Sequence, residues 1–260
     1  MSPVTSPVAR LILEYDGTDF SGWARQPGLR TVQGEVERAL RIVLRRDAVA
    51  LAVAGRTDAG VHARAQVASY AGEPAGSDAL NALLPYDVAV LDCSPAAPGF
   101  DARHSATSRA YCYRVLSRRA RSPQERRLAL HWPHPMASEA LARCARLMLG
   151  RHDFTAFTPT ATDHVHFFRQ VMAAYWRPVG RDLVEFSIEA DAFMRNMIRV
   201  LVGTMLEVAG GRRTFEQFSA LLEGRPRAQA GATAPPHGLH FLGAGYEGRR
   251  LLPVQPELDA

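Results

Sequence analysis

The first hundred residues alternate between short apolar runs and one segment with helical spacing. Apolar side chains at Val32, Val36, Leu40 and Val43 recur every three or four residues, which predicts a helix over residues 32–44. Strands are predicted at residues 8–15, 49–53, 66–70 and 88–91, and a short helix at residues 78–84 that Pro85 ends. The predicted order is strand, helix, strand, strand, helix, strand.

The rest of the chain repeats this order after a proline-rich segment, residues 94–99, which predicts a linker. Its predicted elements are a strand at 110–116, an amphipathic helix at 138–149 with Ser138 as N-cap, a hairpin of strands at 171–176 and 183–188, an apolar helix at 192–208, a shorter helix at 214–224 and a strand at 239–246. This pattern favours an α+β protein with two ferredoxin-like (βαββαβ) halves, residues 1–98 and 99–260, whose sheets join side by side. The repeat is architectural, since the two halves share little residue-level similarity.

Composition narrows the class of protein. No apolar run approaches the roughly 18 residues that a membrane helix needs, and the first ten residues lack the apolar core of a secretory signal. The three cysteines are scattered without a CxxC pair, which argues against a disulfide framework or a zinc knuckle and favours a reducing compartment. We therefore expect a cytoplasmic protein that is not embedded in a membrane.

The charge favours an anionic partner. The chain has 31 basic and 26 acidic residues, a net charge of +5 and a pI of about 9.5, which favours a partner such as nucleic acid. All 31 basic residues are arginine, because the sequence contains no lysine. This excludes Schiff-base lysine chemistry, a pyridoxal anchor and the lysine of a phosphate-binding loop. Arginine also suits phosphate forks and base stacking.

The stretch AGRTDAGVHARAQVASY, residues 54–70, places a polar loop between glycines at the end of a strand. Such loops are natural positions for catalytic groups, and Asp58 could be a general base, a nucleophile or a metal ligand there. A turn-forming aspartate that caps backbone amides has the same spacing. Only His62 is a nearby metal ligand, and the cluster at residues 163–166 (DHVH) is typical of a polar loop, so we expect no metal site.

The sequence GRTDAGVHARAQV resembles the signature loop of the tRNA pseudouridine synthase A (TruA-type) family. Further blocks that resemble this family follow in the same order and cover most of the chain: YDGTDFSGW (15–23), TVQGEVERAL (31–40), NALLPYDVAV (81–90), FDARHSATSRAYCYRV (100–115), GRHDFTAF (150–157), AFMRNMIRVLVGTMLEVAGG (192–211) and APPHGLHF (234–241). Two positions depart from the pattern, because Ala24 stands where glutamine is common and His240 where tyrosine is common. Neither belongs to the residues that the resemblance places in the site.

The resemblance implies a fold of two ferredoxin-like halves around one active-site cleft. It implies an isomerase that converts uridine, once the base has left its stack, to pseudouridine at about positions 38 to 40 in the anticodon stem-loop of tRNA. No cofactor or metal is implied. By the same resemblance Asp58 is the catalytic residue, Arg199 keeps its carboxylate ionised, and Tyr111 holds the flipped uracil. Arg56 is assigned to substrate binding, and the family implies a homodimer.

Eight arginines lie between residues 101 and 127, many of them in the predicted loop SRRARSPQERR. A run of like charge is usually a solvated surface, but on a basic chain with a presumed tRNA substrate we expect phosphate contacts from Arg118, Arg119 and Arg121. Two alternatives to a synthase stay open: a non-catalytic RNA-binding protein, since paired ferredoxin-like units also describe RNA-recognition modules, and a nucleoside hydrolase that uses Asp58. The intact GRTD loop and the lack of an RNP1-type run argue against the first alternative.

Overall fold

The structure is a computed structural model that describes residues 7–162 and 164–253. These residues form an α+β fold whose strands pair in both parallel and antiparallel ways. The described chain divides into two compact units. Unit 1 comprises residues 7–109 and 240–249, and unit 2 comprises residues 110–162, 164–239 and 250–253. No helix in these residues is long and apolar enough to cross a membrane.

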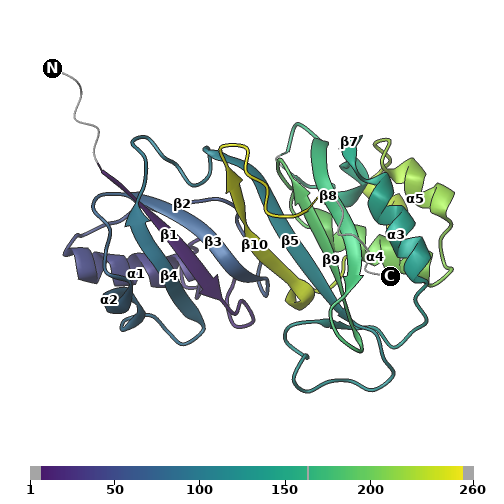
Figure 1. Ribbon diagram of the computed structural model, residues 1–260, viewed down its shortest axis with the longest axis horizontal. Coiled ribbons are helices and arrows are strands. Elements are labelled where there is room, and N and C mark those ends of the chain that lie inside the picture. The colour runs from purple at the N-terminus through teal and green to yellow at the C-terminus, as the bar shows by residue number, and fades with distance from the viewer. Residues whose placement is uncertain (1–6, 163, 254–260) are drawn as a thin grey trace. The chain divides into compact units, whose positions relative to one another are not determined.

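Unit 1 is a mainly antiparallel sheet with two helices on one side of it (Figure 1). Its elements are β1 (Val8–Tyr15), α1 (Val32–Leu44), β2 (Ala52–Val53), β3 (His62–Ala71), α2 (Ser77–Asn81), β4 (Val88–Pro95) and, from the end of the chain, β10 (Leu239–Tyr246) apart from its first residue. The strand order is β4-β1-β3-β2, with antiparallel neighbours throughout. β10 adds a parallel pair with β3, in which His240 lies opposite His62.

The core of unit 1 follows from the spacing of its apolar residues. Alternate residues of β1 are buried, among them Leu11 and Leu13, because successive side chains of a strand point to opposite faces. Helix α1 buries Val36 and Leu40, which its helical period places on one side. Thr31 caps α1 by accepting a hydrogen bond from Gly34 N. Tyr15, the last residue of β1, pairs with Ala63 near the start of β3, which brings the loop after β1 close to the loop before β3.

Unit 2 contains a second set of strands with three helices packed together beside them (Figure 1). Its elements are β5 (Ala106–Leu116), whose first four residues belong to unit 1, β6 (Leu130–His131), α3 (Ser138–Leu147), β7 (Gly150–Asp153), η1 (Thr155–Phe157), β8 (Phe168–Pro178), β9 (Leu183–Ala190), α4 (Met197–Ala209), α5 (Phe215–Leu221), η2 (Arg227–Gln229) and η3 (Pro236–Gly238). The strand order is β5-β9-β8-β7, and β6 pairs in parallel with β5. The β8–β9 hairpin and the β7–β8 pair are antiparallel.

Several predicted boundaries are wrong. The strand predicted at 49–53 is reduced to Ala52–Val53, because only these residues pair with β3. β4 extends through Pro95 into the predicted linker, since Ser94 and Pro95 pair with β1. Ser138 is the first residue of α3 rather than its N-cap. The N-cap is Ala137, whose amide donates to Ala209 O.

The long helix of unit 2 begins five residues later than predicted. Asn196 has a φ of 62°, which is a left-handed conformation that a right-handed helix cannot include. α4 therefore starts at Met197, and Arg195 precedes it. The following helix, α5, begins at Phe215, one residue later than predicted, because Thr214 is its N-cap and forms a capping box with Gln217, and it ends at Leu221.

Candidate active site

Asp58 lies in the loop between β2 and β3 of unit 1, which we call the aspartate loop (residues 54–61). The Asp58 side chain is half-buried, Arg56 is exposed and Thr57 is 6% exposed. Val61 N donates to Asp58 O at 3.1 Å, and Gly60 has a φ of 78° that glycine adopts without strain. The loop is therefore a tight turn that points the residues on either side of Thr57 away from the core.

The chain that follows β1 packs directly against the aspartate loop. Trp23 N donates to Thr57 O at 3.0 Å. A β-carbon at Gly17 would collide with the carbonyl of Val61, and one at Gly22, whose φ is 94°, would lie 2.9 Å from Thr57 O. Glycine is required at both positions because the two backbones touch. The aspartate loop is thus held from one side by residues 16–23.

A buried hydrogen-bond network holds the aspartate loop from below. Tyr15 Oη lies 2.7 Å from Thr57 Oγ1, and Gln66 Nε2 donates to both Tyr15 Oη at 3.2 Å and Gly55 O at 2.8 Å. Tyr15 is 2% and Gln66 0% exposed, so bulk water does not compete for the hydrogen bonds of these two side chains. Burial raises the pKa of Tyr15 to about 12, and its hydroxyl stays protonated at neutral pH. The network fixes the loop immediately before Asp58.

His62 is occupied by packing and by the backbone of residues 16–17. Gly17 N donates to His62 Nδ1 at 3.1 Å, and Asp16 Oδ1 lies 3.2 Å from the same nitrogen. A nitrogen that accepts from an amide carries no proton, so we interpret the approach to Asp16 as a close contact rather than an ion pair. The ring of His62 stacks on His240, with centroids 4.7 Å apart. Among the described residues no group of three His, Cys, Asp or Glu could hold a metal ion, and Asp163 lies outside them.

Tyr111 lies on β5 of unit 2 and is 7% exposed. Its ring meets Phe193 edge to face, with centroids 5.2 Å apart. Tyr113, two residues along the strand, is fully buried and donates from its hydroxyl to Pro235 O at 2.8 Å. Burial raises the pKa of Tyr113, and the charge of Arg199 opposes that rise. Tyr113 is therefore a packed residue, and Tyr111 is a largely buried ring with a small exposed portion.

Arg199 lies in the first turn of α4 and is half-buried. Its Nε donates to Ala234 O at 2.7 Å and its NH1 to Asn196 Oδ1 at 2.9 Å. Arg195 is exposed and lies before the helix, so the two arginines do not share a solvated helix face. The left-handed Asn196 thus both starts α4 and orients the Arg199 guanidinium.

The predicted residues are divided between the two units. Asp58 and Arg56 share the aspartate loop of unit 1, and Tyr111 and Arg199 belong to unit 2. Pairing of Arg199 with Asp58 joins residues of different units and stays a prediction. The roles of Tyr15, Thr57 and Gln66 as supports of Asp58 were not predicted from the sequence. The only available signal was their position inside the blocks YDGTDFSGW and GRTDAGVHARAQV.

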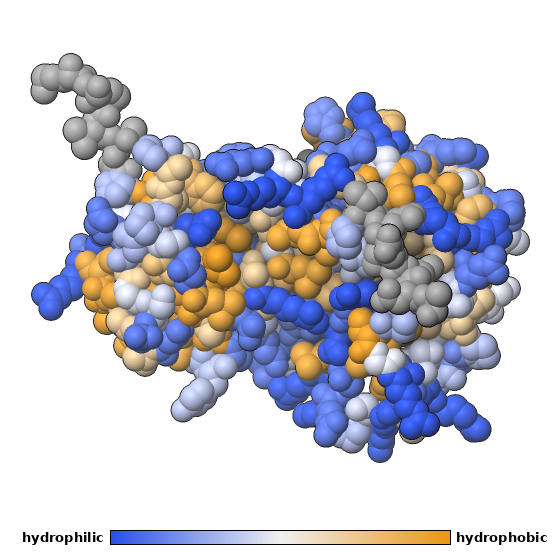
Figure 2. Space-filling view, viewed as in Figure 1, coloured by the Kyte–Doolittle hydropathy of each residue, from blue (hydrophilic) through white to orange (hydrophobic). Residues whose placement is uncertain are grey.

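The arginine-rich loop, residues 117–129, connects β5 with β6 without helix or strand. In the view of Figure 2 the surface at the lower right, where this loop lies in Figure 1, is mostly hydrophilic. The guanidinium of Arg118 is held in place by protein contacts, because its NH1 lies 3.2 Å from Asp182 Oδ2 and its Nε donates to Ala120 O at 2.9 Å. Arg119 and Arg121 are exposed. The three arginines of the predicted phosphate contact are therefore not equivalent.

Comparison with known proteins places these features in one family of RNA-modifying enzymes. The family model described as tRNA pseudouridine synthase matches residues 144–247. The chain is 44% identical over 260 residues to the tRNA pseudouridine synthase A of Frankia casuarinae, covering 96% of this chain and 91% of that protein. It is 40% identical over 240 residues to the enzyme of the same name from Geobacillus sp. (strain WCH70), covering 90% and 96%.

The chain therefore belongs to the tRNA pseudouridine synthase A family, which is a family of isomerases. This confirms the resemblance seen in the sequence, and it favours a synthase over the hydrolase and the non-catalytic RNA-binding protein. Among solved structures, a Cbf5-Nop10-Gar1 complex aligns with 90% of this chain and 59% of that chain. Its TM-score of 0.38 and 10% identity are too low to support an argument about the fold.

Proposed function

We propose that the chain isomerises uridine to pseudouridine in the anticodon stem-loop of tRNA, with Asp58 as the essential carboxylate and no cofactor. The reaction breaks the N1–C1′ bond and forms a C5–C1′ bond. C5 loses a proton and N1 gains one, so that atoms balance and nothing is oxidised or reduced. One positioned carboxylate can begin such a reaction, as a base or as a nucleophile. The observation that carries the proposal is Asp58 itself, half-buried in a turn that the rest of unit 1 holds in place.

The substrate-binding part of the proposal assigns Tyr111, Arg199 and Arg56. The ring of Tyr111 stacks on the target uracil after the base has flipped out of the RNA helix. The edge-to-face contact with Phe193 supports this role because it holds the ring of Tyr111 in one orientation. Arg199 keeps the Asp58 carboxylate ionised, and its two hydrogen bonds at the start of α4 support this role by fixing the guanidinium. Exposed Arg56 contacts a phosphate.

We further propose that residues 1–98 and 99–260 are two ferredoxin-like halves around a central cleft. The antiparallel order β4-β1-β3-β2 of unit 1 supports this for the first half. The succession β5, α3, β8, β9, α4 supports it for the second. The compact units divide elsewhere, because β10 pairs with β3 although it ends the second half in sequence. A cytoplasmic homodimer completes the proposal and rests on the family resemblance alone.

The proposal is tested at Asp58. Asp58→Asn and Asp58→Ala should fold and bind tRNA but lose at least about a hundredfold in pseudouridine formation, since removal of a catalytic acid–base group typically has an effect of that size. Digestion of treated tRNA and quantification of pseudouridine measures this, and free uracil in the digest would instead indicate a hydrolase. Asp47→Asn is the matched control, because Asp47 is an exposed aspartate of the same unit. Turnover above a hundredth of the parent rate in either Asp58 variant would remove Asp58 as the essential group.

A further inference from the structure

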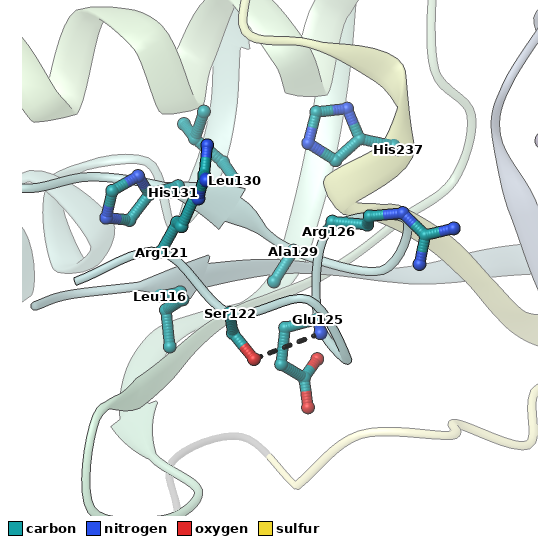
Figure 3. Close-up of a pocket in the computed structure, with 9 residues that line it drawn as sticks. All are labelled: Leu116, Arg121, Ser122, Glu125, Arg126, Ala129, Leu130, His131 and His237. Atoms are coloured by element: carbon teal, nitrogen blue, oxygen red, sulfur yellow. Dashed lines mark hydrogen bonds between the residues drawn. The ribbon is translucent and has the colours of Figure 1, made fainter.

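A pocket of about 240 Å³ lies in unit 2 under the arginine-rich loop (Figure 3). Leu116 at the end of β5, Ala129 and Leu130 supply its apolar part. Arg121 and Arg126 of the loop and His237 of η3 stand around it. None of Asp58, Tyr111 and Arg199 lines the pocket, so it is separate from the residues proposed for catalysis.

The loop that forms the pocket is held by its own hydrogen bonds. Glu125 O accepts from Leu128 N at 2.9 Å and from Ala129 N at 3.0 Å, and Glu125 N donates to Ser122 Oγ at 3.3 Å. His131 Nε2 lies 2.9 Å from Arg118 O. These bonds shape the walls before any ligand arrives. A preorganised site loses less conformational entropy when it binds.

The charge around the pocket is positive. Glu125 lines it, but its Oε2 lies 3.0 Å from Arg114 NH1, and that pair neutralises the carboxylate. Among the residues that the structure describes, no carboxylate oxygen lies within 4.0 Å of the guanidinium of Arg121 or Arg126. Both side chains are exposed. Two uncompensated guanidinium groups thus flank a small apolar surface.

We infer that this pocket binds one unstacked nucleotide of the tRNA substrate other than the target uridine. The base lies against Leu116, Ala129 and Leu130, and the phosphate is bound by Arg121 and Arg126. Unpaired RNA bases are commonly stacked on aromatic rings, histidine included, while arginine forks bind the phosphate. His131 and His237 supply two such rings in the lining of the pocket. The pocket is smaller than the roughly 300–1,000 Å³ of drug-sized sites, which favours a single base. This inference rests on the proposed function, since tRNA is the ligand.

The two parts of the inference are separable by substitution. Ala129→Leu fills the apolar part and leaves every charge in place, so it should weaken tRNA binding about fivefold or more, as expected when one stacked base is displaced, without changing the salt dependence. The double variant Arg121→Ser, Arg126→Ser should reduce the log–log salt slope by about 0.7 to 0.9 for each lost contact. Ala120→Leu is the matched control, because Ala120 is exposed in the same loop and does not line the pocket.

The experiment measures dissociation constants of unmodified tRNA at several salt concentrations, thermal unfolding of every variant, and binding of UMP and of inorganic phosphate to the parent. We expect UMP to bind more tightly than phosphate and to be excluded by Ala129→Leu. If Ala129→Leu does not fold, the double variant Arg121→Ser, Arg126→Ser decides instead: it should bind UMP more weakly than the parent, although the residues proposed to hold the target uracil are unchanged, and equal UMP binding would overturn the inference. Equal tRNA affinity of a folded Ala129→Leu and Ala120→Leu, or equal binding of UMP and phosphate, overturns the inference and leaves only phosphate contacts. Pseudouridine formation by the parent is measured alongside, so that failure of the proposed function is seen separately.

Discussion

The aspartate loop and the arginine-rich loop are both polar connections between strands, but they are held in different ways. The aspartate loop is fixed by other parts of unit 1, through Trp23 N on one side and the buried pair of Tyr15 and Gln66 below. The arginine-rich loop is fixed mainly by bonds among its own residues and close neighbours, such as those of Glu125 and Arg118. The first arrangement controls the position of the Asp58 side chain, whereas the second exposes the positive charges of arginine side chains to solvent. Substitutions should therefore affect turnover at the first loop and binding at the second.

Apart from substitution of Asp58 itself, the largest effect is expected from Gly17→Ala. The new β-carbon would collide with the Val61 carbonyl, and because both partners are backbone atoms the aspartate loop must move. A displacement of about 1 Å in a catalytic group can reduce the rate about a hundredfold. Single-turnover pseudouridine formation measures the loss. Gly180→Ala is the control, since a β-carbon there meets nothing within 4 Å. Parent-like turnover of Gly17→Ala would show that the close contact does not position Asp58.

Thr57→Val tests the buried network with almost no change in shape. The variant removes one of the two partners of the Tyr15 hydroxyl and leaves Gln66 as the other. We expect about a tenfold fall in kcat with KM unchanged, because a positioning residue acts on the reacting geometry rather than on binding. A loss of about 1 kcal/mol in unfolding free energy should accompany it. Thr57→Ser keeps the hydroxyl and should restore kcat. If kcat stays low in Thr57→Ser, or is unchanged in Thr57→Val, the hydroxyl has no positioning role.

Tyr111→Phe extends the comparison of the two loops to a residue that lies on a strand, β5. We expect the variant to keep most tRNA affinity, because the ring remains, and to lose about tenfold in single-turnover rate if the hydroxyl accepts or relays the C5 proton. Tyr113→Phe is the neighbour control and should leave turnover nearly unchanged, although it removes the hydrogen bond to Pro235 O and should lower stability by about 1 kcal/mol. A parent-like rate for Tyr111→Phe would leave Tyr111 only as a stacking surface.

The smallest effects are expected in the arginine-rich loop. Arg119→Ser should lower tRNA affinity a fewfold and reduce the salt slope by about 0.7 to 0.9, since Arg119 is exposed and each phosphate contact releases counterions. Arg118→Ser should instead lower the thermal midpoint, because Arg118 bonds to Asp182 and Ala120. Turnover at saturating tRNA should be unchanged in both. An unchanged salt slope for Arg119→Ser would identify a solvated surface.

The elements with a regular pattern could be predicted from the sequence, and those set by single contacts could not. The bounds predicted for β1, α1 and β10 are those of the structure, because each has an uninterrupted apolar period. The predicted start of α4 was wrong, because a single residue in the left-handed conformation, Asn196, determines where the helix begins. The bonds from Gln66 to Tyr15 and Gly55 join residues up to 51 positions apart, and no local pattern encodes them. Asp58 and Arg56 were placed in one loop by their adjacency, whereas the pairing of Asp58 with Arg199 stays a prediction.

The position of Gln66 limits the length of the chain around Asp58. Gln66 lies on β3, where it pairs with Leu13 of β1, and its amide reaches back to Gly55 O. Because side chains alternate across a strand, one residue inserted or deleted between Gly55 and Gln66 would either strain the turn or shift the β1–β3 register. A shift of one residue would turn the Gln66 amide to the opposite face of the sheet, away from Tyr15. The number of residues from Gly55 to Gln66 is thus constrained by the structure in addition to the side chains that lie between them.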